Sequence, residues 1–260
     1  MLIILSPSKG QDFELAAPTQ SYSIATQLND SIELVRQLKK LSVTEIQNLM
    51  SLSDNLAKLN WQRYQDFKVP FNPQNAKQAL FAFKGDVYSG INTSSMTDAD
   101  FEYAQQHLII LSGLYGSLRP LDLIQPYRLE MKTKLANKRG NNLYQFWGNS
   151  ITAQLNKSLA LQQGKMIVNL ASNEYWQAVR QKNLDAPVIN IAFKENKDGK
   201  SRIIAIFAKK ARGMMADFII RNQIATLAEL KEFNYSKYKF DKQASTASLL
   251  VFSRKQPAKK

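Results

Sequence analysis

The sequence predicts a mixed α/β fold, in which a mixed sheet is flanked by helices. Four apolar runs of four to six residues have the length of strands, and unbroken apolar runs suit strands that are covered on both faces. The intervals between the runs carry helix start signals and apolar residues at helical spacing. No stretch rich in Ser, Gly and Pro divides the chain, so we expect residues 1–260 to form a single domain. The four runs are Leu2–Leu5, Leu108–Leu111, Met166–Leu170 and Ile203–Ala208.

The first helices are predicted from their N-terminal caps. Ser42 and Glu45 have the spacing of a capping box, in which each side chain binds the backbone N–H of the other residue. Thr97 stands directly before Asp98 and predicts the start of another helix. His107 is expected to cap or pack near the end of that helix.

Helical spacing also appears in the second half of the chain. A stripe of apolar residues covers 143–155 and predicts a helix. Gly164 is expected to close this helical region, because glycine is common just after a last turn. Thr226 and Glu229 repeat the capping-box spacing and predict a further helix.

A hairpin and a tail complete the predicted elements. Asp198 and Gly199 predict a hairpin turn, because Asp-Gly tolerates the positive φ that such turns require. The turn is expected to join a strand over 188–193 to a strand over 203–207. Residues 254–260 are expected to form a basic, frayed tail.

The charge of the chain is large and unevenly distributed. The formal net charge is +14. Residues 1–130 carry 11 Lys and Arg against 13 Asp and Glu, whereas residues 131–260 carry 24 against 8. Such a one-sided field attracts phosphates, nucleic acid or anionic surfaces. A lysine-rich proteome would also raise the count of Lys, although it would not by itself remove acids.

The rare residue types exclude several classes of function. Cysteine is absent and His107 is the only histidine, which argues against disulfides, thiolate or histidine-rich metal centres and a protease-type triad. No apolar run reaches the roughly 18 residues of a membrane span, and the beginning, MLIILSPSKG, lacks a basic leader with a cleavage site. We therefore expect a cytoplasmic protein with no cofactor, no bound metal, no membrane contact and no obligate protein partner.

The segment 111–135, LSGLYGSLRPLDLIQPYRLEMKTKL, combines residue types that ordinary loops avoid. Gly113 and Gly116 permit unusual backbone conformations, and Pro120 and Pro126 fix φ. Within this segment, charged residues alternate with apolar residues that can anchor it in the core. This combination is typical of a stiff loop that holds charges in a binding site. The charged residues are Arg119, Asp122, Arg128 and Glu130.

Polar and basic residues follow each predicted strand, and the carboxyl ends of parallel strands meet at one edge of a sheet. Lys84, in a tight turn around Gly85, is expected to pair with Asp86 or to face the same edge. A basic cleft with embedded carboxylates is therefore predicted. The candidate nucleic-acid-binding residues are Lys9, Lys84, Arg119, Arg128, Lys209, Lys210 and Arg212, and the candidate catalytic carboxylates are Asp122, Glu130 and Glu174.

Each candidate also has a structural interpretation. Residues 172–174 could be only an N-cap with a first-turn acid. Residues 209–212 could be a solvated helix face. Arg128 could form a buried ion pair with Glu130 or Asp122.

Familiar nucleotide-binding motifs are absent. The chain has neither a GxxxxGK[ST] loop nor a GxGxxG fingerprint. Residues 113–116, Gly-Leu-Tyr-Gly, resemble the glycine-rich turn of helix-hairpin-helix DNA binders, in which backbone N–H groups bind a phosphate. On that interpretation Gly113 and Gly116 form a backbone phosphate turn within a helix-hairpin-helix-like element.

Taken together, these motifs resemble the YaaA family, bacterial cytosolic proteins linked to peroxide stress. The resemblance covers most of the chain. It rests on FKGDVYSGI (83–91), LSGLYGSLRPLDLIQPYRLEM (111–131), LYQFWG (143–148), NLASNEYW (169–176) and AKKARGMMADFII (208–220).

The resemblance implies a DNA-binding protein of mixed α/β fold with a positively charged cleft and a helix-hairpin-helix-like element. It further implies a role in limiting hydrogen peroxide damage, in part by lowering free intracellular iron, and it brings no established reaction. One departure from the family pattern is Asp217, at a position that is more often Arg. This acid is expected to lie close to Arg212.

Three functions remain open from the sequence. The first is a stress protein that binds double-stranded or branched DNA through the basic cleft. The second is a glycosylase-like enzyme acting on nucleic acid or a nucleotide, with Lys209 or Lys210 as a candidate amine. The third is direct iron binding by oxygen ligands, which one histidine and no cysteine make a poor match.

Overall fold

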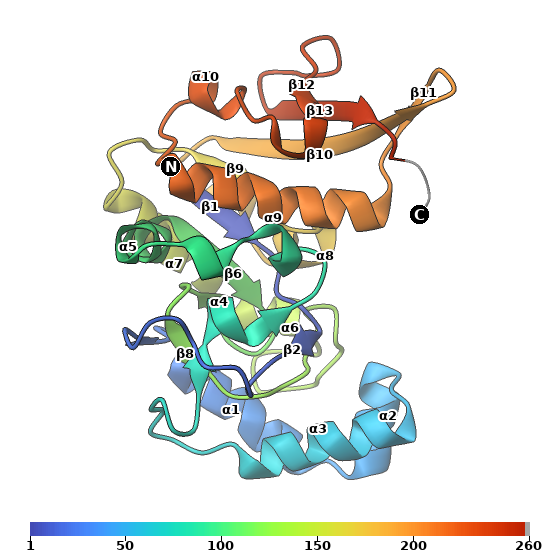
Figure 1. The fold of residues 1–260 in the computed structure, drawn as a ribbon. Coiled ribbons are helices and arrows are strands. Elements are labelled where there is room, and N and C mark those ends of the chain that lie inside the picture. The colour runs from blue at the N-terminus through green and yellow to red at the C-terminus, as the bar shows by residue number, and fades with distance from the viewer. Residues whose placement is uncertain (258–260) are drawn as a thin grey trace.

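The computed structural model describes residues 1–257 and contains one large sheet with a parallel centre (Figure 1). The strands of this sheet are β1 (Leu2–Leu5), β6 (Leu108–Ser112), β7 (Gly116–Leu118), β9 (Ile167–Asn169), β10 (Val188–Lys197), β11 (Lys200–Arg202), β12 (Lys239–Phe240) and β13 (Leu249–Lys255). They lie in the order β12-β13-β10-β9-β1-β6-β7, and β11 pairs with β10. Strands β13, β10, β9, β1 and β6 are parallel, whereas β7, β11 and β12 pair antiparallel. The predicted mixed α/β class is confirmed.

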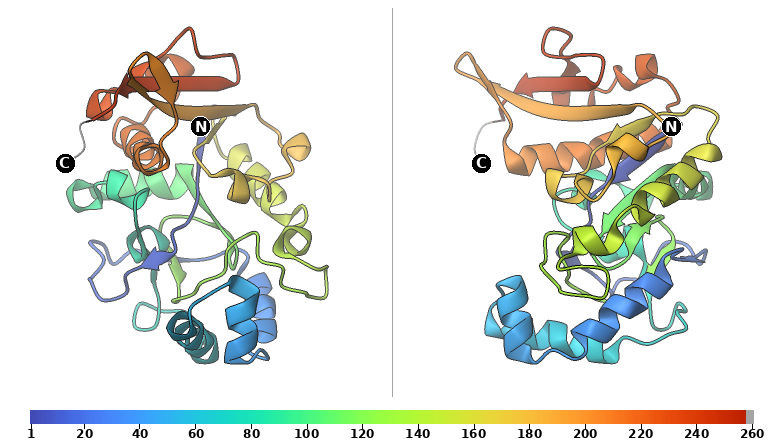
Figure 2. Two further views of the ribbon diagram at one scale, coloured as in Figure 1. Left: turned by 90° about the vertical axis from the view of Figure 1, so that its right-hand side faces the viewer. Right: turned by 180° about the vertical axis from the view of Figure 1, so that it is seen from behind.

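Helices cover both faces of the sheet. Figure 2 shows α5 (Asp98–His107) and α9 (Ala205–Arg221) on one face and α7 (Ser150–Ala160) on the other. Strand β1 lies between β6 and β9, and its four residues have no exposed surface (0%). Full burial on both faces explains why its sequence is an unbroken apolar run. No helix within residues 1–257 is long and apolar enough to cross a membrane.

A helical region lies at the end of the molecule opposite β12 and β13 (Figure 1). It consists of α1 (Leu28–Leu38), α2 (Val43–Met50) and α3 (Asp54–Asp66). Two small sheets accompany it, one of β2 (Gly10–Gln11) and β5 (Phe83–Lys84), the other of β3 (Ser23–Ile24), β8 (Asp122–Ile124) and β4 (Lys77–Gln78). The remaining helices are short: α4 (Ala79–Ala82), α6 (Leu143–Trp147), α8 (Asn173–Trp176), α10 (Leu227–Leu230) and the 3₁₀ turns η1 (Tyr88–Gly90), η2 (Thr93–Ser95), η3 (Gln181–Asn183) and η4 (Tyr235–Lys237).

The predicted helix starts, the strand over 188–193 and three of the four apolar runs that were predicted as strands are confirmed. Ser42, Thr97 and Thr226 each form a capping box at the start of α2, α5 and α10. His107 lies at the end of α5, where its Nδ1 is 2.9 Å from the carbonyl oxygen of Met1 and its ring stacks on Tyr103. Strands β1, β6 and β9 match the first three apolar runs.

The fourth predicted strand, Ile203–Ala208, was wrong. The hairpin turn at Asp198-Gly199 is confirmed, but its second strand is β11, and α9 begins at Ala205. Ile203 and Ile206 are each 58% exposed. The strand prediction assumed that these apolar residues are buried in the sheet, and their exposure shows that they are not.

The apolar stripe over 143–155 is two helices, not one. Gly148 has a φ of 50° and a ψ of −114° and ends α6, and α7 begins at Ser150. Glycine adopts this backbone conformation without the steric cost that other residues incur. The stripe therefore predicted which residues are buried, but not the break between the helices.

The predicted tail was partly wrong. Arg254 and Lys255 belong to β13, and the guanidinium of Arg254 pairs with the buried carboxylate of Glu195 at 2.9 Å. Arg254 also lies over the ring of Tyr238. These contacts fix the chain in the sheet as far as residue 255. Residues 258–260 lie outside the described part.

Helix α9 approaches η1 closely at two glycines. A Cβ added to Gly213 would overlap the carbonyl oxygen of Val87 and would lie 3.1 Å from the Cα of Gly90. A Cβ on Gly90 would in turn lie 2.7 Å from the backbone nitrogen of Met214. Backbone therefore packs on backbone, which fixes the segment 85–90 against α9.

We expect Gly213→Ala to destabilise the protein by about 1–3 kcal/mol, the usual cost of overpacking. Inside a helix, alanine is ordinarily favoured over glycine by about 1 kcal/mol, so the sign of the change tests the close contact. Urea unfolding measures it. Gly164→Ala is the control, because its added Cβ would meet its nearest atoms at 3.7–3.8 Å. A stabilised Gly213→Ala variant would contradict the packing.

Candidate nucleic-acid interface

The carboxyl ends of β1 and β9 form one wall of a pocket. Both strands end at the same edge of the sheet because they are parallel neighbours. The backbone N–H of Ser172 donates to Ser6 Oγ at 2.8 Å, and the Tyr88 hydroxyl donates to the carbonyl of Ser6 at 3.1 Å. These bonds join the two strand ends to the segment that packs on α9.

This strand-end pocket has a volume of about 330 Å³. It is lined by residues from 6–9, 85–87 and 170–175, together with Glu130, Lys209 and Arg212. Five candidates that lie far apart in sequence therefore meet in one pocket: Lys9, Glu130, Glu174, Lys209 and Arg212.

A second hollow continues from this pocket. It has a volume of about 560 Å³ and is lined by residues 48–51 at the end of α2 and by residues from 128–134. The two hollows share Lys9 and Glu130, so we treat them as one two-part cleft. Six cations and three carboxylates line the two-part cleft: Lys9, Arg128, Lys132, Lys134, Lys209, Arg212, Asp86, Glu130 and Glu174.

Glu130 lies among three of these cations. Its carboxylate is 3.0 Å from Lys9 Nζ, 3.3 Å from Arg128 Nη2 and 3.5 Å from Lys132 Nζ. Burial alone would raise the pKa of Glu130, but the bonds and charges of Lys9, Lys132 and Arg128 lower it below its ordinary value. Glu130 is therefore ionised at neutral pH and positions the three cations without neutralising all of them.

Arg128 is held by its main chain as well as by Glu130. Its carbonyl oxygen accepts a hydrogen bond from the buried hydroxyl of Tyr64. The Nε of Arg128 is buried and has no hydrogen-bond partner within residues 1–257. Such a donor is rare in native proteins.

Helix α9 contributes the cations on the other side of the strand-end pocket. Lys209 Nζ lies 3.9 Å from Asp86. Burial lowers the pKa of the Arg212 guanidinium. Asp217, which the sequence places near Arg212, instead pairs with Arg221 at 3.0 Å. Lys210 is exposed on α9 but does not line the two-part cleft.

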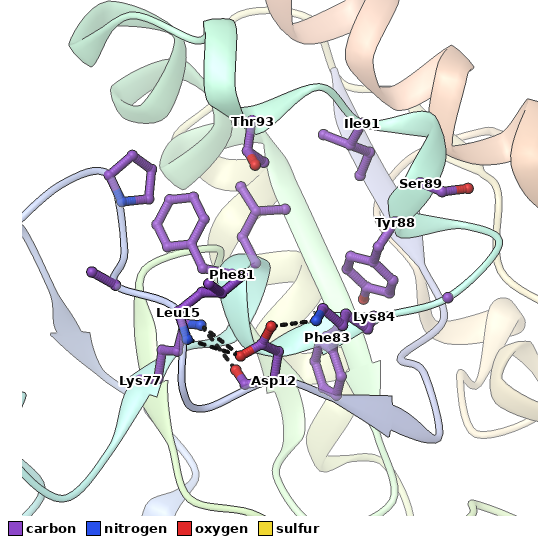
Figure 3. A pocket seen from close by; sticks show the side chains of 14 residues that line it. Asp12, Leu15, Lys77, Phe81, Phe83, Lys84, Tyr88, Ser89, Ile91 and Thr93 are labelled. Carbon is purple, nitrogen blue, oxygen red and sulfur yellow. Dashed lines mark hydrogen bonds and ion pairs between the residues drawn. The ribbon is translucent and has the colours of Figure 1, made fainter.

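Lys84 points away from the two-part cleft. Its ammonium pairs with Asp12 in a neighbouring hollow of about 300 Å³, which Phe81, Phe83 and Tyr88 also line (Figure 3). The predicted partner, Asp86, binds Lys209 instead. The side chain of Lys84 points towards Asp12 because β5 pairs with β2, which brings Lys84 beside the segment that carries Asp12.

Arg119 and Asp122 form a local ion pair outside the two-part cleft. The carboxylate of Asp122 accepts two hydrogen bonds from Arg119, one from the backbone N–H at 2.8 Å and one from the guanidinium at 3.0 Å. The carboxylate also accepts a hydrogen bond from Ser23 at 2.6 Å, and Asp122 is only 1% exposed. The expectation that these two residues converge with the other candidates was therefore wrong.

The expectation of a helix-hairpin-helix-like element at Gly113–Gly116 was also wrong. The turn joins the antiparallel strands β6 and β7, and its residues are buried. The backbone N–H groups of Leu114 and Tyr115 donate to Ser112 Oγ at 3.2 and 3.0 Å. These donors are already satisfied inside the protein, so the turn offers no phosphate site.

Sequence reasoning missed Lys132 and Lys134, although a signal was present. From Tyr127 to Ala136 every odd-numbered residue is buried and every even-numbered residue is half-buried or exposed. This alternation is the pattern of an extended chain with one face in the core. Extending it beyond Glu130 would have placed both lysines on the face that carries Arg128.

The whole chain resembles a known family. Residues 1–244 match the model of the peroxide stress protein YaaA. A UPF0246 protein of Saccharophagus degradans is 50% identical over 256 residues, which cover 98% of this chain and 100% of that protein. A UPF0246 protein of Aliivibrio fischeri is 49% identical over 259 residues, which cover 100% of both chains.

The chain therefore belongs to the peroxide stress protein YaaA family. This membership supports a role in peroxide stress.

Asp12 gives a prediction of acid sensitivity. Its pKa lies well below the usual range, first because Lys84 binds the carboxylate and then because the backbone N–H groups of Leu15 and Glu14 donate to it. Its stabilising contribution is complete above the unfolded-state pKa of about 3.9. The contribution is lost as the pH falls from there through the lower folded-state pKa.

We therefore expect Asp12→Asn to be less stable than the wild type at neutral pH and to lose less stability on acidification. Urea unfolding between neutral and strongly acidic pH measures both effects. Asp54→Asn is the control, because Asp54 is exposed and pairs with Lys58 on the surface of α3. An Asp12→Asn variant with the wild-type acid dependence would contradict the role of this ion pair.

Proposed function

We propose that this protein binds double-stranded or branched DNA in the two-part cleft as part of the response to hydrogen peroxide. The observation that carries the proposal is the row of Arg128, Lys132 and Lys134 on one face of an extended segment. Lys9 lies beside this row through its bond to Glu130, and Lys209 and Arg212 line the adjoining strand-end pocket. A row of cations along a groove matches the regular phosphates of a nucleic-acid backbone.

The balance of charge supports an anionic ligand. Six cations against three carboxylates leave the cleft basic, and the second half of the chain adds a wider positive field. Contacts of this kind are independent of base sequence, because they reach phosphates and not base edges. The proposal therefore concerns DNA in general and assigns no preferred sequence.

We propose that the protection against peroxide includes a lowering of free intracellular iron by an indirect route. Within residues 1–257 no group of three or more His, Cys, Asp and Glu side chains could hold a metal ion. Asp122, one of the three candidate carboxylates, is occupied by Arg119 and Ser23. Equilibrium dialysis with ferrous iron tests this view, and stoichiometric uptake would overturn it.

The strand-end pocket favours a second candidate, a glycosylase-like enzyme that processes nucleic acid or a nucleotide. Glu130 and Glu174 are carboxylates in a small pocket, and the ammonium of Lys209 lines the same space. An enzyme that uses the lysine would form an imine with an opened sugar and release water. Borohydride trapping on a duplex with an abasic site tests this candidate. A covalent adduct that Lys209→Gln abolishes would establish it, and no adduct would remove the version that uses the lysine.

DNA binding in the cleft predicts a specific dependence on salt. We expect the logarithm of the binding constant to fall linearly with the logarithm of salt concentration, because each neutralised phosphate releases counterions. Lys134→Gln and Lys209→Gln are each expected to reduce the slope by about 0.9, the value for one phosphate contact. Fluorescence anisotropy on a labelled duplex at several salt concentrations gives the slopes.

The matched control is Lys157→Gln, which removes the same charge from an exposed position on α7 away from the cleft. Its slope should equal that of the wild type. Binding that does not respond to salt would show that DNA does not occupy the cleft. The same conclusion would follow if all three variants changed the slope equally.

A further inference from the structure

The strand-end pocket carries charges of both signs, which a plain phosphate backbone does not require. Lys9, Lys209 and Arg212 contribute cations, whereas Asp86, Glu130 and Glu174 contribute carboxylates to the same pocket. A carboxylate repels phosphate and accepts hydrogen bonds without donating any. The pocket therefore matches a ligand that combines an anionic group with hydrogen-bond donors.

Arg212 is suited to the anionic group. Its guanidinium is half-buried, and within residues 1–257 it has neither a carboxylate partner nor a hydrogen bond to another side chain. The acid on its own helix, Asp217, is occupied by Arg221 and by the backbone N–H of Asn92, each at 3.0 Å. A guanidinium with free N–H groups binds phosphate through two parallel hydrogen bonds.

Glu174 is suited to the donor groups. Its carboxylate accepts the backbone N–H of Lys132 at 3.4 Å, while the ammonium of Lys132 binds Glu130 at 3.5 Å. Within the described residues no lysine or arginine forms an ion pair with Glu174. Most of its lone pairs thus remain open to a ligand, and an exocyclic amine of a base is a fitting donor.

Apolar side chains complete the pocket. Pro7, Val87, Leu170 and Tyr175 also line it, and they can contact the flat face of a ring. Its volume of about 330 Å³ is at the small end of the range for small-molecule sites, roughly 300–1,000 Å³. The space suits one compact unit and not a stretch of duplex.

We propose that the strand-end pocket binds a single nucleotide unit, with the phosphate on Arg212 and Lys209 and the amino group of the base donating to Glu174. The same unit can be a free nucleotide or a nucleotide displaced from the DNA helix, as in proteins that flip a base. The displaced form rests on the proposed function, because it requires DNA in the cleft. The free form does not.

Two bulged duplexes test the displaced form. They differ only in the unpaired nucleotide, which is cytosine in one and thymine in the other. Cytosine presents an amino group to Glu174, whereas thymine presents a carbonyl oxygen, which the carboxylate repels. We expect the wild type to bind the cytosine bulge about tenfold more tightly, which corresponds to about 1.4 kcal/mol. We also expect it to bind the cytosine bulge more tightly than a fully paired duplex.

Glu174→Gln separates this contact from general attraction between charges. The variant loses a negative charge, so general electrostatics would strengthen its binding to every DNA. We expect it instead to lose the preference for cytosine, because an amide can both accept and donate. Glu102→Gln, on the exposed face of α5, removes the same charge elsewhere and should retain the preference. Thermal unfolding verifies that each variant is folded.

Calorimetry with dCMP and dTMP tests the free form. Binding of dCMP that is stronger than that of dTMP and depends on Glu174 supports the pocket, even if no DNA is bound. That result together with an absence of DNA binding would contradict the proposed function and leave the pocket standing. Salt-dependent DNA binding with equal affinity for both bulges, and no preference between dCMP and dTMP, would overturn the pocket and leave the proposed function standing.

Discussion

The ion pairs around Glu130 are the interaction on which the cleft depends. Lys9 follows the central strand β1, whereas Arg128 and Lys132 lie on the extended segment that leads away from β8. Three cations gathered at one point would repel one another in the absence of an acid. A partly buried carboxylate allows them to approach, and its single charge leaves an excess of positive charge. The positive side of the cleft therefore follows from the way in which the strand end is joined to this segment.

Packing determines which other side chains reach the cleft. The alternation from Tyr127 to Ala136 inserts every second residue into the core and turns the others outward. On the opposite side, the contact of Gly213 with Val87 and Gly90 brings α9 against the segment 85–90. These two constraints place Arg128, Lys132 and Lys134 in one part of the cleft and Lys209 and Arg212 in the other.

The sequence predicted the central sheet and the approach of Lys9 to Glu174, because the parallel strands β1 and β9 end at one edge. Lys209 and Arg212 line the same pocket, but they reach it from α9 and not from the end of a strand, as was predicted. It failed where a local partner decides the direction of a side chain. Asp122 binds Arg119 three residues away, and β5 turns Lys84 towards Asp12. Such pairings depend on tertiary contacts that residue type and spacing do not encode. Lys132 and Lys134 were predictable in principle, because the alternation that places them is visible in the sequence.

The most direct test of the central claim is the reactivity of individual lysines towards an acetylating reagent, measured by mass spectrometry with and without duplex DNA. If DNA lies in the two-part cleft, bound duplex should protect Lys9, Lys132, Lys134 and Lys209 and leave Lys157 on α7 unchanged. Protection outside the cleft, for example at Lys197 and Lys200 of the β10–β11 hairpin alone, would contradict the account. If adding DNA changed the reactivity of no lysine, that result would also contradict the account.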